Sequence, residues 1–454
     1  MAELHKHKRA EFSSKFGVIA AAAGSAVGLG NIWKFPYITG VYGGAAFLFV
    51  YLAFILAIGL PVMLSELIIG RKSRKNAFGA FKKLAPGSPW KFVGMLGVGA
   101  AFMILAFYGV VAGWSIGYIV TSVLNGFKSQ SPEQLNAMFT GFIESPLKPV
   151  LYQIIFMLLT GAIVMVGVKD GIEKNVKIMM PLLVVIILIL DVRSVTLHGA
   201  GEGLKFLFHP DFSKLTGEGI LSALGHAFFS LSLGMGTLIT YGSYIDKNNN
   251  LLNTAINVTF ADTLIAILAG IAIFPAVFAF GIEPSSGPGL VFITLPNVFQ
   301  QMPGGYFFSI LFFLLLALAA LTSSISILEV VVAYFHEELK MKRKLATGFA
   351  TVLITLLGII CSLSMGVFKD YTFNGLNFFD LLDWTSANLL LPLGGLFISL
   401  FIGWKLGRKK VKSEIEKGAT IPGIFLSVFM FLIKIIAPIA IAIVFLKGIG
   451  LLKF

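Results

Sequence analysis

Charged residues and cysteine are both scarce in this chain of 454 residues. Only 13% of the residues are charged, whereas soluble globular proteins have about 25%. The single cysteine, Cys361, excludes an intrachain disulfide and a multi-cysteine metal site. In contrast, 57% of the residues are hydrophobic, 43 are phenylalanine, and the mean hydropathy is +0.90. This composition indicates a polytopic membrane protein.

Long apolar runs separated by short polar loops divide the chain. A helix needs about 20 mostly apolar residues to cross the hydrocarbon core of a bilayer. Runs such as residues 311–321 lack the period-two alternation of barrel strands, so the membrane-spanning segments are expected to be helices. We expect eleven transmembrane helices, near residues 16–39, 43–70, 92–125, 149–168, 175–197, 218–243, 252–280, 304–335, 346–367, 378–404 and 421–447.

The eleven spans predict two halves of five helices and one additional helix. On this division we expect a cytoplasmic N-terminal tail (1–15), a first five-helix repeat (16–200), an extracellular loop (201–217), a second five-helix repeat (218–405), a cytoplasmic loop (406–420), and an eleventh helix with an external C-terminus (421–454).

Lysine and arginine are concentrated in the N-terminal tail and in every second loop, as on the cytoplasmic side of membrane proteins. The net charge of +13 therefore follows from topology, and it does not require a nucleic-acid partner. We expect a multi-pass protein of the cell (inner) membrane, in contact with the lipid bilayer, with its N-terminus in the cytoplasm.

The first and sixth spans are interrupted by small residues in matching places of the two halves. Residues 24–31 (GSAVGLGN) hold three glycines, and residues 230–236 (SLSLGMG) hold two. Each glycine weakens a helix by roughly 1 kcal/mol relative to alanine. Glycines that only allow close helix packing are one interpretation. Paired interruptions are, however, typical of transporters whose binding sites lie near the membrane midplane.

Three adjacent hydroxyl residues, Thr322, Ser323 and Ser324, lie at membrane depth in the eighth span. A single buried hydroxyl commonly bonds to a carbonyl of its own helix. Three in a row suit a hard cation such as sodium, because hard cations prefer oxygen ligands.

These segments resemble the neurotransmitter:sodium symporter family. The motifs are GLGNIWKFP at 28–36, FSLSLG at 229–234, LTSS at 321–324 and GIEK at 171–174. The resemblance extends over nearly the whole chain and is greatest to the bacterial branch, within which the chain is similar to a bacterial tyrosine transporter. It implies an all-α membrane protein with a leucine-transporter-type fold, a 5+5 inverted repeat of helices, and breaks in helices 1 and 6. It also implies a symporter that uses sodium to import a hydrophobic or aromatic L-amino acid, with tyrosine favoured, by alternating access.

The resemblance also implies two sodium sites. The first would use the carbonyl of Ala26, the amide of Asn31, the carbonyl and hydroxyl of Ser230, and a residue of the seventh span. Asp262 lies one residue beyond the expected position in that span, Ala261, so it either ligates sodium directly or only balances charge. The second site would use the carbonyls of Gly24, Val27 and Ala319 with the hydroxyls of Thr322 and Ser323.

The substrate site follows from the same resemblance. The carboxylate of the substrate would bind the backbone amides of Leu29 and Gly30 and the hydroxyl of Tyr108. Its ammonium would meet the carbonyls of Ala26, Phe229 and Ser230 and the hydroxyl of Ser232. The side-chain pocket would be lined by Ile104, Tyr108, Phe229, Ser232, Met235 and Ile327. Methionine at position 235, where an aromatic residue is common, favours a pocket for a large side chain.

Two charged gates are implied on either side of this pocket. The outer gate would pair Lys34 with Asp383. Relatives usually have arginine at the position of Lys34, and lysine offers only a point charge where arginine offers a bidentate fork. The inner gate would pair Arg9 with Glu337, near Tyr244. Glu66, a carboxylate in the second span, is expected to brace the broken sixth helix.

Other functional classes are less compatible with the sequence. Residues 113–117 (GWSIG) match a hydrolase pattern, and His226 is an intramembrane histidine, but the pattern requires a strand–turn–helix elbow. We therefore expect no enzyme activity and no organic cofactor. An ion channel, or a sodium-coupled transporter of another small amine or amino acid, is the alternative. Animal relatives require chloride, whereas the charge of Asp262 predicts chloride-independent transport.

Overall fold

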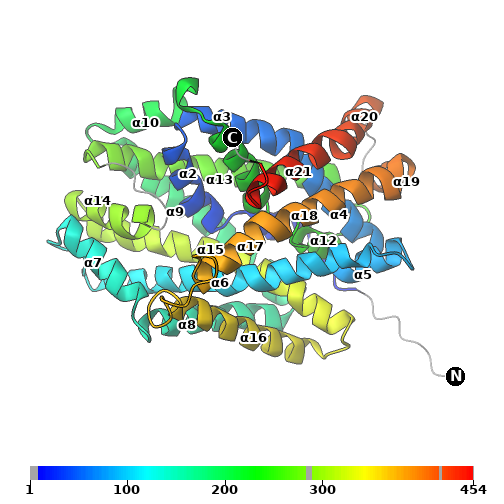
Figure 1. The fold of residues 1–454 in the computed structure, drawn as a ribbon, viewed down its shortest axis with the longest axis horizontal. Coiled ribbons are helices and arrows are strands. Elements are labelled where there is room, and N and C mark those ends of the chain that lie inside the picture. Colours follow the sequence, from blue (N-terminus) through cyan, green and yellow to red (C-terminus); the bar gives the residue numbers. More distant parts are fainter. Residues whose placement is uncertain (1–8, 283–288, 419–421, 453–454) are drawn as a thin grey trace.

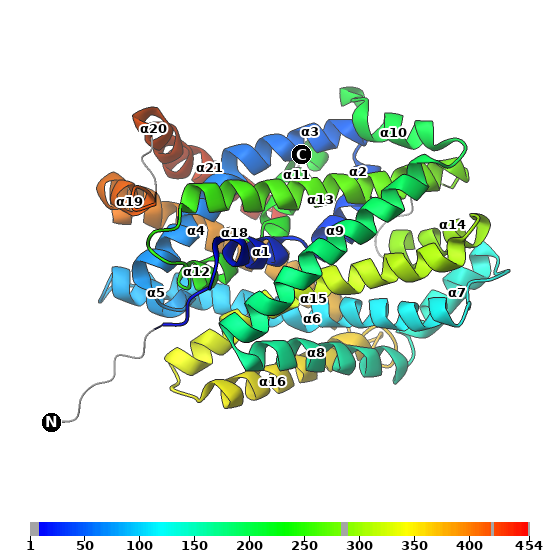
Figure 2. The same cartoon turned by 180° about the vertical axis from the view of Figure 1, so that it is seen from behind.

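The computed structural model describes residues 9–282, 289–418 and 422–452. Within these ranges the chain forms helices and turns, without a strand. Most of the long helices run along the long axis of the molecule, packed side by side (Figure 1). On the opposite side, α9 crosses α1 and α15 diagonally (Figure 2).

The first half of the chain forms helices α1 (Lys15–Ala26), α2 (Phe35–Val41), α3 (Ala45–Phe54), α4 (Leu60–Ser73), α5 (Ala77–Leu84), α6 (Lys91–Val123), α7 (Pro132–Ile143), α8 (Lys148–Val166), α9 (Lys174–Val195) and α10 (Ala200–Phe208). The second half forms α11 (Gly217–Ser230), α12 (Thr237–Gly242), α13 (Leu251–Ala279), α14 (Leu295–Gln301), α15 (Gly305–Glu337), α16 (Arg343–Leu363), α17 (Phe378–Thr385), α18 (Leu391–Leu400), α19 (Gly407–Ile415), α20 (Gly423–Phe431) and α21 (Ala437–Gly448). Short π-helical segments join several of these helices end to end, such as Ile55–Gly59 and Phe401–Leu406.

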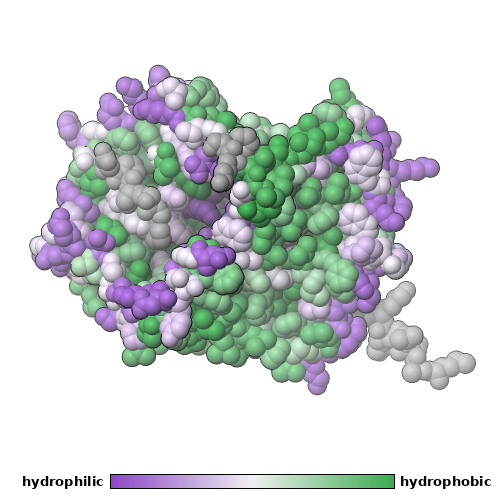
Figure 3. Space-filling model, in the orientation of Figure 1, coloured by the Kyte–Doolittle hydropathy of each residue, from purple (hydrophilic) through white to green (hydrophobic). Residues whose placement is uncertain are grey.

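Nine helical stretches among the described residues are long and apolar enough to cross a bilayer, or ten when the bent pair of the first span is included. The sixth span consists of α11 and α12, of 14 and 6 residues, and neither is long enough alone. In the space-filling view, hydrophobic side chains dominate the middle of the visible face, and hydrophilic ones gather at both ends of the long axis (Figure 3). This supports an all-α membrane protein, while the count of eleven spans stays a prediction.

The breaks in the first and sixth spans are present where the small residues predict them. In the first span, the helix ends at Ala26 and the chain bends by 49° before it continues to Val41. In the sixth span, Ser232, Gly234 and Gly236 have φ angles of +55°, +80° and +77°, which a right-handed helix cannot contain. Both breaks therefore leave backbone groups without helical partners inside the protein.

Glu66 of α4 holds the break of the sixth span, as expected. Its carboxylate accepts a 2.7 Å hydrogen bond from the backbone amide of Gly234. Position 234 requires glycine for its positive φ and also for lack of room, because a Cβ atom there would lie 2.5 Å from the carbonyl oxygen of Leu391. The brace fixes the irregular backbone without closing it into a helix.

Candidate functional site

The oxygen atoms predicted for the second sodium site lie together where α15 passes the break of the first span. The Ser323 hydroxyl lies 3.1 Å from the carbonyl oxygen of Val27 and 3.4 Å from that of Gly24. The Thr322 hydroxyl lies 3.4 Å from the same Val27 oxygen and 2.9 Å from that of Ala319. All five residues are buried.

This cluster is chemically suited to an alkali cation. It contains three carbonyls and two hydroxyls and no nitrogen or sulfur ligand, which is the donor set of a hard cation. Ser324, the third hydroxyl of the motif, is buried but has no hydrogen-bond partner among the described residues. The three adjacent hydroxyls therefore differ in their surroundings: those of Thr322 and Ser323 contact carbonyls at the break of the first span, and that of Ser324 does not.

A second cluster joins both broken spans to α13. The side-chain amide of Asn31 donates to the Ser230 hydroxyl at 3.2 Å and to the Asp262 carboxylate at 2.7 Å. The Ser230 hydroxyl lies 2.9 and 3.0 Å from the two carboxylate oxygens. Tyr51 of α3 reaches the same carboxylate at 3.4 Å. Asp262 is fully buried, so its charge needs these partners and a counter-charge.

The residues predicted for the substrate pocket surround one small cavity of about 20 Å³. Nine of the ten line its wall, together with Ser25, Gly28 and Ser323: Ala26, Gly30, Ile104, Tyr108, Phe229, Ser230, Ser232, Met235 and Ile327. The tenth, Leu29, is beside it, because its backbone amide donates to the Tyr108 hydroxyl at 3.0 Å. This cavity is far smaller than an amino acid, so binding one requires the wall to move.

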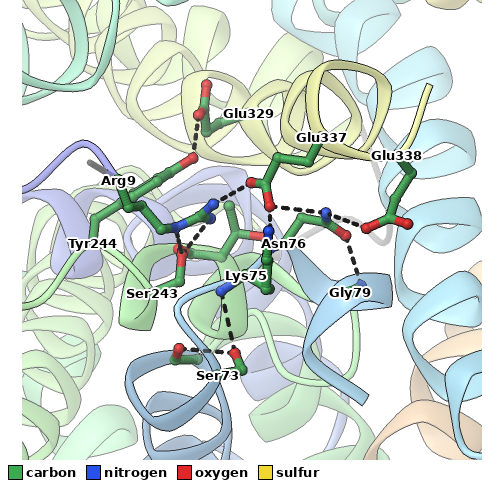
Figure 4. Close-up of polar contacts among 12 residues, drawn as sticks. Arg9, Ser73, Lys75, Asn76, Gly79, Ser243, Tyr244, Glu329, Glu337 and Glu338 are labelled. Atoms are coloured by element: carbon green, nitrogen blue, oxygen red, sulfur yellow. Dashed lines mark hydrogen bonds and ion pairs between the residues drawn. The ribbon is translucent and has the colours of Figure 1, made fainter. Parts of the chain in front are cut away.

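The residues predicted for the inner gate lie in contact with one another (Figure 4). The guanidinium of Arg9 pairs with the carboxylate of Glu337, donates to the Ser243 hydroxyl at 2.9 Å, and lies 4.6 Å from the ring centre of Tyr244. Burial, together with the nearby Glu329 carboxylate, holds the pKa of Tyr244 well above its usual range. The tyrosine therefore stays protonated and donates to Glu329 at 2.6 Å.

The outer gate differs from expectation. Lys34 and Asp383 form no ion pair, although both are described residues; the Lys34 ammonium lies instead 4.5 Å from the ring centre of Phe229. The physical reason is that a flexible point charge gains a cation–π contact here without holding a fixed geometry. Beyond Lys34 and Phe229 lies a cavity of about 370 Å³, which extends to α17 and α21. The cavity therefore lies on the side of the predicted pocket where Lys34 and Phe229 stand.

Some residues of the site were not predicted. The Ser25 carbonyl accepts from the Ser232 hydroxyl at 2.8 Å, and the Ser25 hydroxyl accepts from Ser326 at 2.8 Å. Ser25 lies inside the glycine-rich break, so that position was a usable signal. Tyr51 lies in an apolar run, and no sequence signal separates it from a core tyrosine.

Comparisons with known proteins identify the family of this chain. The model of the sodium:neurotransmitter symporter family matches residues 9–134 and 140–453. The chain is 43% identical to the uncharacterized sodium-dependent transporter YhdH of Bacillus subtilis, over 99% of this chain and 100% of that protein. It is 38% identical to an uncharacterized sodium-dependent transporter of Haemophilus influenzae, over 97% of this chain and 98% of that protein.

A solved structure shares the fold. The crystal structure of MhsT in complex with L-phenylalanine matches with a TM-score of 0.90 and 49% sequence identity, over 97% of this chain and 100% of that chain. The expected membrane fold and family are thereby confirmed. This chain belongs to the sodium:neurotransmitter symporter family.

Proposed function

We propose that this protein is a sodium-coupled symporter that imports a hydrophobic or aromatic L-amino acid by alternating access. The observation that carries the proposal is the meeting of Asn31, Ser230 and Asp262 in one buried cluster beside the pocket. The cluster of Thr322 and Ser323 lies against the same break of the first span. Relatives named as sodium-dependent transporters support sodium as the coupling ion.

Two sodium ions would bind as co-substrates in these clusters. The first would be held by Ala26, Asn31, Ser230 and Asp262, next to the substrate carboxylate. The second would be held by Gly24, Val27, Ala319, Thr322 and Ser323. Because every donor is an oxygen, the set favours a hard cation. Each sodium ion that enters through a potential of 100 mV supplies about 2.3 kcal/mol.

The pocket favours a large apolar side chain, and tyrosine is our preferred substrate. Ile104, Met235 and Ile327 give it apolar walls, and methionine adapts its shape readily. The match with MhsT, crystallised with L-phenylalanine, supports an aromatic substrate. The amides of Leu29 and Gly30 and the hydroxyl of Tyr108 would hold the carboxylate, and the Ser232 hydroxyl would lie near the ammonium.

The gates give a direction to the cycle. The end of the molecule that holds Arg9 and Glu337 would face the cytoplasm, as the distribution of lysine and arginine predicts. With the inner gate paired and the outer side hollow, sodium and substrate would enter past Lys34 and Phe229. Breaking the Arg9–Glu337 pair would then open the inner path.

The decisive experiment is uptake of labelled amino acids into proteoliposomes. We expect accumulation of tyrosine only with an inward sodium gradient, with phenylalanine and leucine as effective competitors and γ-aminobutyrate as a poor one. Equal uptake when potassium replaces sodium would overturn sodium coupling. Strong competition by an amine without a carboxylate would overturn the assignment of an amino acid.

A further inference from the structure

The tenth span is too long to end inside the membrane. Residues Phe378–Leu406 form a helical stretch of 29 residues, and α19 follows it after a kink at Gly407, whose φ is +76°. At about 1.5 Å per residue the stretch before the kink is about 43 Å long, whereas the hydrocarbon core is about 30 Å thick. The following helix, α19, lies in the segment that the sequence predicted as a loop. Trp404, 64% exposed, precedes α19, and tryptophan is enriched at the level of the lipid headgroups.

One face of α19 is fixed to the protein. Val411 and Ile415 are fully buried, and between them the Glu414 carboxylate accepts a 2.9 Å hydrogen bond from Arg71 of α4. Arg71 also donates to the carbonyl of Asn249, at 2.5 Å, in the loop before α13. Neither charged side chain is exposed, so separating them would leave a buried charge unpaired. The helix therefore cannot rotate about its own axis.

The opposite face is strongly basic. α19 carries four exposed basic residues, Arg408, Lys409, Lys410 and Lys412, and a fifth, Lys405, is exposed just before the kink at Gly407. Lys412 is partly balanced by Glu416 at 3.6 Å. Within the part of the chain that the structure describes, Lys405, Lys409 and Lys410 form no ion pair with a carboxylate. Figure 3, which has the orientation of Figure 1, shows hydrophilic side chains at the end of the molecule where Figure 1 labels α19.

We propose that the basic face of α19 is a docking site for anionic phospholipid headgroups of the adjacent leaflet. Its position at headgroup depth and its unbalanced positive charge both match such a surface. Because α19 is held by Glu414 and Arg71, a bound headgroup is also linked to α4 and to the loop after the sixth span. If the proposed orientation holds, this leaflet is the cytoplasmic one; the docking itself does not depend on the orientation or on the proposed function.

The test measures which lipid lies next to α19 in the full-length protein. Ser413, exposed on α19, is replaced by cysteine in a Cys361→Ala background and labelled with a fluorophore. The protein is placed in phosphatidylcholine vesicles with one fifth phosphatidylglycerol, and bromine is carried by one lipid or the other. At equal bromine content, we expect brominated phosphatidylglycerol to quench at least about twofold more strongly, and high salt to reduce the difference.

Two variants make the result specific. Lys405→Gln/Lys409→Gln/Lys410→Gln should bring the quenching ratio to about one if headgroup charge drives docking. Lys169→Gln/Lys342→Gln/Lys344→Gln removes three other exposed lysines and should keep the parent ratio. An equal ratio in the parent, or an unchanged ratio in the first variant, overturns the proposal. Loss of the preference on adding soluble glycerol 3-phosphate also overturns it, in favour of a site for small anions. None of these readings depends on transport.

Discussion

The side-chain amide of Asn31 and the carboxylate of Asp262 lie 2.7 Å apart, although 231 residues separate them in the chain. The Ser230 hydroxyl lies within 3.0 Å of both oxygens of that carboxylate. The break of the first span, the break of the sixth and the middle of α13 therefore meet at one buried negative charge. This relationship bears on the ion requirements of transport.

Transport is expected to proceed unchanged when gluconate replaces chloride. Two sodium ions and a zwitterionic substrate carry a charge of +2, and the Asp262 carboxylate offsets one unit without an added anion. Asp262→Ser should abolish uptake or make it respond to chloride, measured in proteoliposomes. Asp191→Ser is the control, since Asp191 is also buried but has no hydrogen-bond partner among the described residues. A parent protein that stops working without chloride would contradict this role.

Replacing both Thr322 and Ser323 with alanine should raise the sodium concentration for half-maximal uptake by about tenfold or more. A contact to a charged group is worth roughly 1.5–3 kcal/mol, and two such contacts are removed. Membrane insertion should be unaffected, because the helix keeps its backbone bonds. Ser324→Ala, which removes a neighbouring hydroxyl that is not aimed at the break, should leave sodium dependence unchanged. An unaltered sodium dependence in the well-inserted double variant would make these hydroxyls purely structural.

Glu337→Ala should expose the cytoplasmic half of the pathway and reduce uptake. The side chains of Arg9 and Glu337 are each only 13% exposed, so the pair is shielded from solvent. We expect a shift of about 1–2 kcal/mol toward the inward-open state, or roughly five- to thirtyfold in population. The measurement is the labelling rate of a cysteine placed at Thr240, a buried residue whose hydroxyl does not contact Arg9. Lys82→Gln breaks an exposed pair with Glu338 at the same end and should change this rate little.

Gly28→Ala should reduce uptake more than a glycine-to-alanine substitution at any other position near the pocket. A Cβ atom at this position would lie 2.7 Å from the Tyr108 hydroxyl and even closer to that of Ser323. Overpacking of this kind costs roughly 1–3 kcal/mol and displaces groups assigned to both the substrate and the second sodium. Gly99→Ala in α6, where the added carbon meets nothing within 4 Å, is the control. Equal uptake by the two variants would contradict the assigned pocket.

Local features of the sequence were sufficient for much of the fold. Hydropathy depends only on runs of neighbouring residues, so the membrane class and most spans were predictable. The helix breaks were predictable for a similar reason, because glycine weakens a helix wherever it lies. The hydroxyl motif at Thr322 and Ser323 indicated a cation because its chemistry is contained in adjacent residues. The charged residues of the inner gate came from the family resemblance.

Contacts between distant segments needed the tertiary structure. Whether Asp262 faces Asn31 and Ser230 depends on how α13 is rotated about its axis relative to the two broken spans. Each step of one residue along a helix turns the side chain by about 100°. The partner of Lys34 depends on where Phe229 lies, and the packing of α11 sets that. The sequence predicts a loop over residues 406–420, yet residues 407–415 form the helix α19, in which Arg71, far earlier in the chain, neutralises the buried Glu414. Sequence alone determined which groups are buried in the membrane, and packing decided which of them meet, since side-chain direction is fixed only by neighbouring helices.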